Sequence, residues 1–191
     1  MRRSLTIGAA FLLAGAGLAA SAGQSAATPH RVGTATPADP CSTPWGSSVK
    51  SATGGNANPL TDIRVGRHTC FDRMVFDVSG ASGPVGHHVG YVDAFHQDGS
   101  GDPIPVGGGA VIQIFVSAPS YDPVTMRQVY AGRAGKPLPG VDLTGFSTFK
   151  DTRFGASFEG QTQVGLGVRA RLPFRVLQFD GKLIVDVAHK W

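Results

Sequence analysis

Charged residues stand beside apolar residues in several segments of strand-like composition, which is uncommon unless the charges are paired. Asp72, Arg73, Glu159, Arg175 and Asp186 occupy such positions. Two interpretations are open: one or two ion pairs at the rim of a sheet, or side chains that converge on one groove and bind a ligand. The second defines the candidate ligand-binding residues, which are Arg73, Glu159, Arg175, Asp186 and His189.

An acid and a histidine close together could form a catalytic dyad, and Asp186 with His189 is the nearest approach to one. Three positions apart on one strand, their side chains point to opposite faces, so the dyad fails on geometry. No serine lies in a G-x-S-x-G elbow, and we expect no catalytic residues. An enzyme of unrecognised type stays an alternative, centred on Asp93, His88 and His96 or on the charged set around Arg175.

Residues of metal-binding type gather in one part of the chain. The run 98–102, Asp-Gly-Ser-Gly-Asp, is only weakly similar to a calcium loop, because the defining glycine and the distal glutamate are missing. A tight turn explains the same residues, and no phosphate-loop or dinucleotide motif is present. We therefore expect no metal site and no cofactor. The residues of this group are His87, His88, His96, Asp98 and Asp102.

Cys41 and Cys70 are the only two cysteines. An even count in a chain that is expected to be exported favours a disulfide over a metal site. Closing a loop of about 30 residues would stabilise the fold by roughly 3–4 kcal/mol in the chain-entropy model. Free thiols are the alternative.

The first 22 residues have the pattern of a cleavable signal peptide. Met1-Arg2-Arg3 is a short basic start, Leu5 to Leu18 is apolar but rich in Gly and Ala, and Ala20-Ser21-Ala22 matches an A-x-A cleavage site. The apolar stretch is short for a membrane span. We expect a secreted, extracytoplasmic protein without a transmembrane segment after cleavage; a retained N-terminal anchor is the alternative.

The charge balance argues against nucleic acid as a partner. The chain has 17 basic and 13 acidic residues, and two of the arginines belong to the expected signal peptide. The remaining chain is close to neutral and has no run of Lys and Arg that would follow a phosphate backbone.

A change of composition near Leu60 divides the remaining chain. Residues 23–58 are mostly Ala, Ser, Thr, Gly and Pro, which cannot bury enough apolar area to offset their ordering entropy, so we expect a flexible linker. Trp45 is its one large apolar residue, and we expect it to dock on the domain near the disulfide. Residues 59–191 are expected to form one domain.

Short runs of Val, Ile, Phe and Thr separated by Gly, Pro and Asp predict strands and turns in that domain. Gly accounts for 27 of 191 residues, about twice the usual share. We predict an all-β fold, an antiparallel β-sandwich or a partly open barrel, with an irregular excursion at 121–139. The predicted strands are 73–78, 85–95, 110–117, 146–149, 158–168, 174–179 and 183–189.

Asp180-Gly181 lies between two of these runs and predicts a two-residue type I′ turn, which determines the register of the hairpin. Counting outward from the turn places Arg175 opposite Asp186. Phe174, Val176, Leu183, Val185 and Val187 then share the core face. The ion pair is either a structural cross-strand pair or a ligand contact, with Asp186 holding Arg175 in position.

Seven short motifs occur in an order that resembles the AMIN-like domain of secreted actinobacterial proteins. The resemblance covers roughly residues 60–189, and Cys70 stands where the family more often has a small residue. The motifs are His68-Thr69-Cys70-Phe71-Asp72-Arg73-Met74-Val75-Phe76, Gly90-Tyr91-Val92, Gly99-Ser100-Gly101, Phe158-Glu159-Gly160, Gly165-Leu166-Gly167, Pro173-Phe174-Arg175-Val176 and Val185-Asp186-Val187-Ala188-His189.

AMIN domains are β-sandwich modules of cell-wall amidases and secretion proteins. The resemblance therefore implies a non-catalytic binding module of the cell envelope, with peptidoglycan or another cell-wall glycan as its partner. A carrier of a small apolar molecule between the sheets is the alternative, and it requires a cavity of several hundred Å³, an order of magnitude typical of small-molecule sites.

Overall fold

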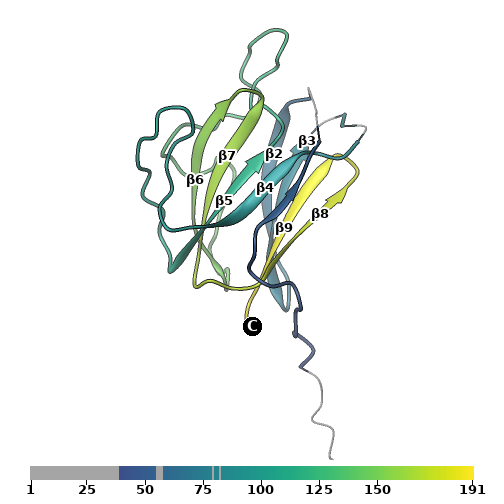
Figure 1. The fold of residues 1–191 in the computed structure, drawn as a ribbon, viewed down its shortest axis with the longest axis vertical. Coiled ribbons are helices and arrows are strands. Elements are labelled where there is room, and N and C mark those ends of the chain that lie inside the picture. Colours follow the sequence, from purple (N-terminus) through teal and green to yellow (C-terminus); the bar gives the residue numbers. More distant parts are fainter. Residues whose placement is uncertain (1–38, 55–57, 79, 82) are drawn as a thin grey trace, which may run out of the picture. The chain divides into compact units, whose positions relative to one another are not determined.

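The alternation of apolar and polar residues after Leu60 produces strands, as expected. The computed structural model describes residues 39–54, 58–78, 80–81 and 83–191 (Figure 1). The expected signal peptide (1–22) and the first part of the expected linker (23–38) lie outside these ranges. The described residues form nine strands and no helix. Their bounds are β1 Lys50–Ala52, β2 Leu60–Arg67, β3 Phe71–Val78, β4 His87–Val92, β5 Ala110–Val116, β6 Phe149–Phe158, β7 Gln161–Val168, β8 Phe174–Phe179 and β9 Lys182–Ala188.

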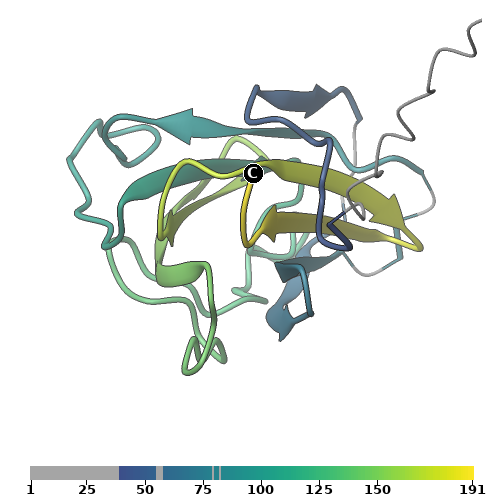
Figure 2. The same cartoon turned by 90° about the horizontal axis from the view of Figure 1, so that it is seen from below.

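The strands form two antiparallel sheets. One has five strands in the order β1-β4-β5-β7-β6, and the other has four in the order β2-β3-β9-β8. The sheets pack face to face and keep separate edges (Figures 1 and 2), so the described chain is a β-sandwich and not a closed barrel. The predicted all-β, single-domain fold is confirmed.

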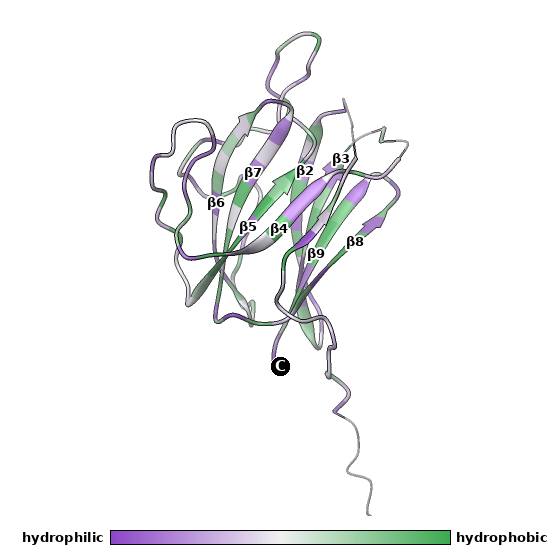
Figure 3. Ribbon diagram, viewed as in Figure 1, coloured by the Kyte–Doolittle hydropathy of each residue, from purple (hydrophilic) through white to green (hydrophobic). Residues whose placement is uncertain are grey.

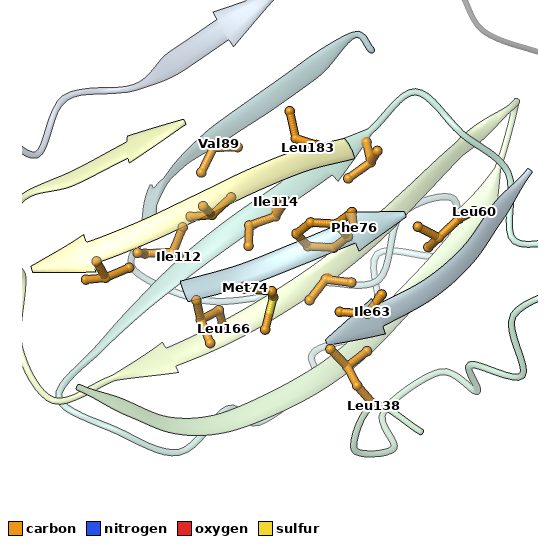
Figure 4. Packing of buried hydrophobic residues seen from close by; sticks show 14 of the residues in the cluster. Leu60, Ile63, Met74, Phe76, Val89, Ile112, Ile114, Leu138, Leu166 and Leu183 are labelled. Carbon is orange, nitrogen blue, oxygen red and sulfur yellow. The ribbon is translucent and has the colours of Figure 1, made fainter. Parts of the chain in front are cut away.

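The core lies between the two sheets and consists of side chains from both. Figure 4 shows Met74 and Phe76 of β3 packed among Ile112 and Ile114 of β5 and Leu166 of β7. In Figure 3 the apolar colour alternates with polar colour along the strands. The main hollows in the described part of the chain lie at its surface and include exposed loop residues. The interior of the described sandwich is occupied by side chains, which leaves the apolar-carrier alternative without support.

The hairpin of β8 and β9 has the predicted register in every pair, from Phe174 opposite Val187 to Phe179 opposite Lys182. Its turn residues Asp180 and Gly181 have φ values of 48° and 68°, as a type I′ turn requires. Phe174 is fully buried on the core face, as expected.

Part of the segment interpreted as a linker belongs to the folded domain. Residues 50–52 form β1, which pairs with β4 at the edge of the five-stranded sheet. Gly90 of β4 makes this approach possible, since a Cβ placed on it would lie 2.9 Å from Cγ2 of Val49. The predicted disulfide between Cys41 and Cys70 is present and ties residues 39–49 to the β2–β3 turn. The linker prediction for 23–58 is therefore wrong for these residues.

β2 and most of β6 were not among the predicted strands. Both strands carry charged residues and a glycine, and β-bulges interrupt their alternation: one between Leu60 and Asp62, and two in β6, at Phe149/Asp151 and Phe154/Ser157. A bulge shifts the face of every following side chain, so a strict two-residue period misses such strands. The predicted irregular excursion at 121–139 is confirmed, and it contains one isolated turn, in which the backbone nitrogen of Met126 donates to the carbonyl oxygen of Asp122 over 2.8 Å.

Candidate functional site

The outer face of the four-stranded sheet carries a row of three charged residues on three neighbouring strands. Arg73 of β3 pairs in register with Asp186 of β9, which pairs with Arg175 of β8. Nε and Nη2 of Arg73 donate to the two oxygens of Asp186 over 2.6 and 2.9 Å. Nε of Arg175 donates to Oδ2 over 2.8 Å. One carboxylate thus positions two guanidinium groups side by side.

The carboxylate of this row is fully buried, whereas the arginines reach solvent. The side chain of Asp186 has 0% exposure, against 26% for Arg73 and 34% for Arg175. The hydrogen bond to Asp186 raises the pKa of Arg73, although partial burial acts in the opposite direction. Two positive charges share one negative charge, so the row keeps an excess of one positive charge at the surface.

Two aromatic rings cover the row. The guanidinium carbon of Arg175 lies 4.2 Å from the ring centre of Trp45 and 5.3 Å from that of Phe71, and Arg73 lies 5.2 Å from Phe71. The rings of Trp45 and Phe71 meet edge to face at 5.7 Å. Guanidinium groups on aromatic faces are held by cation–π attraction. We call Trp45, Phe71, Arg73, Arg175 and Asp186 the arginine–aromatic cluster.

The disulfide and β3 bring the aromatic rings to the cluster. Cys41 is four residues before Trp45, and Cys70 directly precedes Phe71. The carbonyl oxygen of Gly46 also accepts a hydrogen bond from the backbone nitrogen of Phe174 over 2.9 Å, which anchors the segment beside Arg175. Trp45 docks near the disulfide as expected, although it was not among the candidate site residues.

Not every hydrogen-bond donor of the cluster is used. Arg175 donates through Nε, and no acceptor for its Nη1 or Nη2 groups is found among the described residues. The same holds for Nη1 of Arg73. These N–H groups can donate to oxygen atoms of a ligand, while both oxygens of Asp186 are already engaged.

Asp72 and His189 pair with each other and not with the cluster. Nε2 of His189 lies 3.0 Å from Oδ1 of Asp72. The other oxygen, Oδ2, accepts from the backbone nitrogens of Thr148 over 2.5 Å and Phe149 over 3.1 Å. Asp186 is ion-paired, as the first interpretation expected, but Asp72 and Asp186 are both fully buried and do not lie at an exposed rim. Asp186 and His189 form no dyad, as predicted, because they have different partners.

Glu159 is not part of the cluster. It lies in the other sheet, in the turn between β6 and β7, with a φ of 46°, and its side chain has no ion pair with the described residues. Glu159-Gly160 makes a two-residue hairpin turn in which both residues have positive φ. Glu159 and Gly160 therefore follow the last residue of β6, Phe158, as residues of the turn.

The histidine and aspartate group has local structural roles. Nδ1 of His96 lies 3.0 Å from the carbonyl oxygen of Gly101, and Oδ1 of Asp98 accepts from the backbone nitrogen of Gly99 over 3.1 Å. His87 and His88 are in β4, away from this turn in the chain. Among the described residues no group of three His, Cys, Asp or Glu side chains could hold a metal ion. The described part of the chain also has no helix of the length and apolarity that a bilayer crossing needs.

Comparisons with known proteins identify one family. The model of the AMIN-like domain family matches residues 58–189, which include every strand except β1. Neither the curated proteins nor the solved structures contain a match. The match spans most of the chain and includes Phe71, Arg73, Arg175 and Asp186, so the chain belongs to the AMIN-like domain family.

Proposed function

We propose that this chain is a secreted, non-catalytic module of the cell envelope that binds cell-wall glycan through the arginine–aromatic cluster. Membership of the AMIN-like family and the disulfide Cys41–Cys70 fit an extracytoplasmic, cell-wall-associated protein. The signal-peptide pattern of residues 1–22 supports export.

One observation carries the proposal: two guanidinium groups with unused donors lie beside aromatic rings on an outer sheet face. A binding site for a polar ligand combines apolar, often aromatic, surface with a few well-placed polar groups. Sugar rings present both hydroxyl oxygens, which accept from N–H groups, and C–H faces, which pack on aromatic rings. The excess positive charge also favours glycans that carry carboxylate groups.

The arrangement favours binding over catalysis. A general base needs a free carboxylate oxygen or ring nitrogen within hydrogen-bond reach of a substrate. In the cluster both oxygens of Asp186 accept from arginines, and the side chain is fully buried. Asp186 therefore acts as a support that orients Arg73 and Arg175.

The experiment is retention on purified peptidoglycan. Wild-type protein should sediment with the insoluble polymer at low salt, and Arg175→Gln should raise the Kd by about tenfold, the equivalent of 1.4 kcal/mol. Trp45→Ala should raise it as well, because it removes the stacking surface of Arg175.

The matched control is Arg133→Gln, which removes the same charge from an exposed residue of the 121–139 excursion. It should bind like wild type. Thermal melts of all variants confirm that each is folded. Wild-type protein that stays entirely in the supernatant at low salt, or equal binding by Arg175→Gln and Arg133→Gln, would refute the proposal.

A further inference from the structure

One surface hollow lies at the end of the sandwich where β4 ends and β5 begins. It has a volume of about 450 Å³, and its lining residues include Tyr91, Asp93, Arg171 and the glycines 108 and 109. This volume is in the range of small-molecule sites. None of these residues belongs to the arginine–aromatic cluster.

Arg171 is held in the hollow by an aromatic ring and not by a carboxylate. Its guanidinium carbon lies 4.8 Å from the ring centre of Tyr91. The Tyr91 hydroxyl donates to the carbonyl oxygen of Leu172 over 2.7 Å and accepts from the Leu172 nitrogen over 2.8 Å. The ring also packs edge to face on Phe174 at 5.7 Å. Arg171 therefore has a fixed stacking surface, and its guanidinium donates to no acceptor among the described residues.

Asp93 is the one carboxylate among the residues that line the hollow. It lies in the bend directly after β4, which ends at Val92, and lines the hollow together with Tyr91. Asp93 is exposed and has no ion pair with any described residue. In particular, no oxygen of Asp93 lies within the 4.0 Å of an Arg171 nitrogen that an ion pair requires.

The hollow thus offers a cation and an anion that do not neutralise each other. The remaining lining residues, Val92, Val106, Ala110 and Val111, have no charge that would pair with either. Glycines at 108 and 109 let this part of the lining pack closely on the end of β7, because a Cβ on Gly108 would lie 2.7 Å from the backbone oxygen of Val168 and one on Gly109 would lie 2.2 Å from that of Arg169. A ligand that carries both charges close together matches both partners at once.

We propose that this hollow binds a zwitterionic group, in which a carboxylate and an ammonium are attached to one carbon as in an α-amino acid. The carboxylate pairs with the guanidinium of Arg171 and the ammonium pairs with the carboxylate of Asp93. The proposal is independent of glycan binding by the arginine–aromatic cluster, since it uses other residues.

The test uses L-alanine and two analogues that each lack one charge, propionate and ethylammonium. Amide resonances of residues 91–93 and 108–111 report binding in NMR titrations of the folded chain. Alanine should shift these signals at millimolar concentration, and each analogue should bind at least about tenfold more weakly. Alanyl-alanine and soluble peptidoglycan fragments then show whether free amino acids or the peptide part of a polymer is the better source of the group.

Variants separate the two charges. Arg171→Gln and Asp93→Asn should each weaken alanine binding by about tenfold, and Arg171→Lys should fall between, since it keeps the charge without the planar fork. Arg133→Gln is the control and should bind like wild type. Propionate that binds as well as alanine, or Asp93→Asn that binds alanine normally, would show a simple anion site and overturn the proposal.

The absence of any shift with alanine would overturn it as well. Retention on peptidoglycan is measured in parallel. Loss of the alanine response with intact retention would refute only the zwitterion site, whereas an alanine response without retention would refute only the glycan proposal.

Discussion

Two carboxylates on neighbouring strands of one sheet, Asp72 and Asp186, are equally buried but have opposite surroundings. Asp72 of β3 faces the core side and bonds two backbone N–H groups at the start of β6 and the ring of His189. Asp186 of β9 faces outward and bonds two guanidinium groups that reach solvent. The first ties one sheet to the other, and the second holds side chains in place for contact with a partner.

This comparison shows that burial of a charge does not identify a functional site by itself. What distinguishes the two residues is whether their partners have unused donors at the surface. The amide groups bonded by Asp72 have no further N–H to donate, whereas the arginines bonded by Asp186 keep N–H groups that meet no acceptor in the described part of the chain.

The largest effect is expected for Asp72→Ala. This change leaves the buried backbone nitrogens of Thr148 and Phe149 without an acceptor, at about 1–3 kcal/mol each, so unfolding free energy should fall by about 3–5 kcal/mol. Urea denaturation measures it, with Asp102→Ala as the exposed control. The remaining folded protein should bind peptidoglycan normally; a loss below 1 kcal/mol would contradict the role of Asp72 as a tie between sheets.

Removal of the disulfide should act on the surroundings of Asp186 and not on those of Asp72. The double change Cys41→Ser and Cys70→Ser opens a loop with a sequence separation of 29. Stability should fall by roughly 3 kcal/mol. In a Trp191→Phe background Trp45 is the only tryptophan. Its emission should move to longer wavelength as it leaves Arg175, and unchanged emission would show that the disulfide does not hold the ring.

Asp186→Ala should cost less stability than Asp72→Ala but should abolish retention on peptidoglycan. Breaking a wholly buried ion pair costs about 3–5 kcal/mol. Arg73 and Arg175 are partly exposed and can be rehydrated, so we expect about 1–3 kcal/mol here. Melting temperature and polymer sedimentation are measured on the same samples. Normal retention by a folded Asp186→Ala variant would contradict the role of Asp186 in positioning the arginines for binding.

The smallest effect is a pH dependence that should be common to wild type and both carboxylate variants. Burial raises the pKa of Tyr130, and burial also raises that of Tyr91. The unfolded chain releases these phenol protons near pH 10 while the folded chain keeps them, so stability is complete below pH 10 and is lost as the pH rises above it. At pH 10.5 one such tyrosine lowers stability by about 0.8 kcal/mol.

Denaturation at pH 8 and pH 10.5 measures this effect, and Tyr130→Phe should roughly halve it. A much steeper loss in Asp186→Ala than in wild type would mean that the outward row is coupled to these tyrosines. The two carboxylates would then not be independent of the rest of the core.

Prediction from sequence worked where local rules determine the geometry. The Asp180-Gly181 turn determined the pairing of Arg175 with Asp186 because a two-residue loop leaves one register. Counting from the turn could not predict that Arg73 also pairs with Asp186, because the two residues are 113 positions apart in the chain. Trp45 was expected to dock, yet its place over Arg175 depends on a disulfide whose direction along the surface no local pattern predicts.

Glu159 shows the opposite error. Its position beside Phe158 suggested a buried charge, but positive φ at Glu159 and Gly160 makes both turn residues. The sequence interpretation considered only the apolar neighbours of Glu159 in the chain. Its position is instead determined by the turn that reverses the chain between β6 and β7.

The sequence by itself determined the all-β class and the face that each residue of the β8–β9 hairpin presents, because alternation and turn chemistry act over a few residues. The even cysteine count favoured the disulfide without determining it. Only the tertiary structure decided which charges meet. Sheet order places β9 between β3 and β8, and this order follows from the packing of the whole core. The arginine–aromatic cluster is therefore a property of the assembled sandwich and not of any single segment.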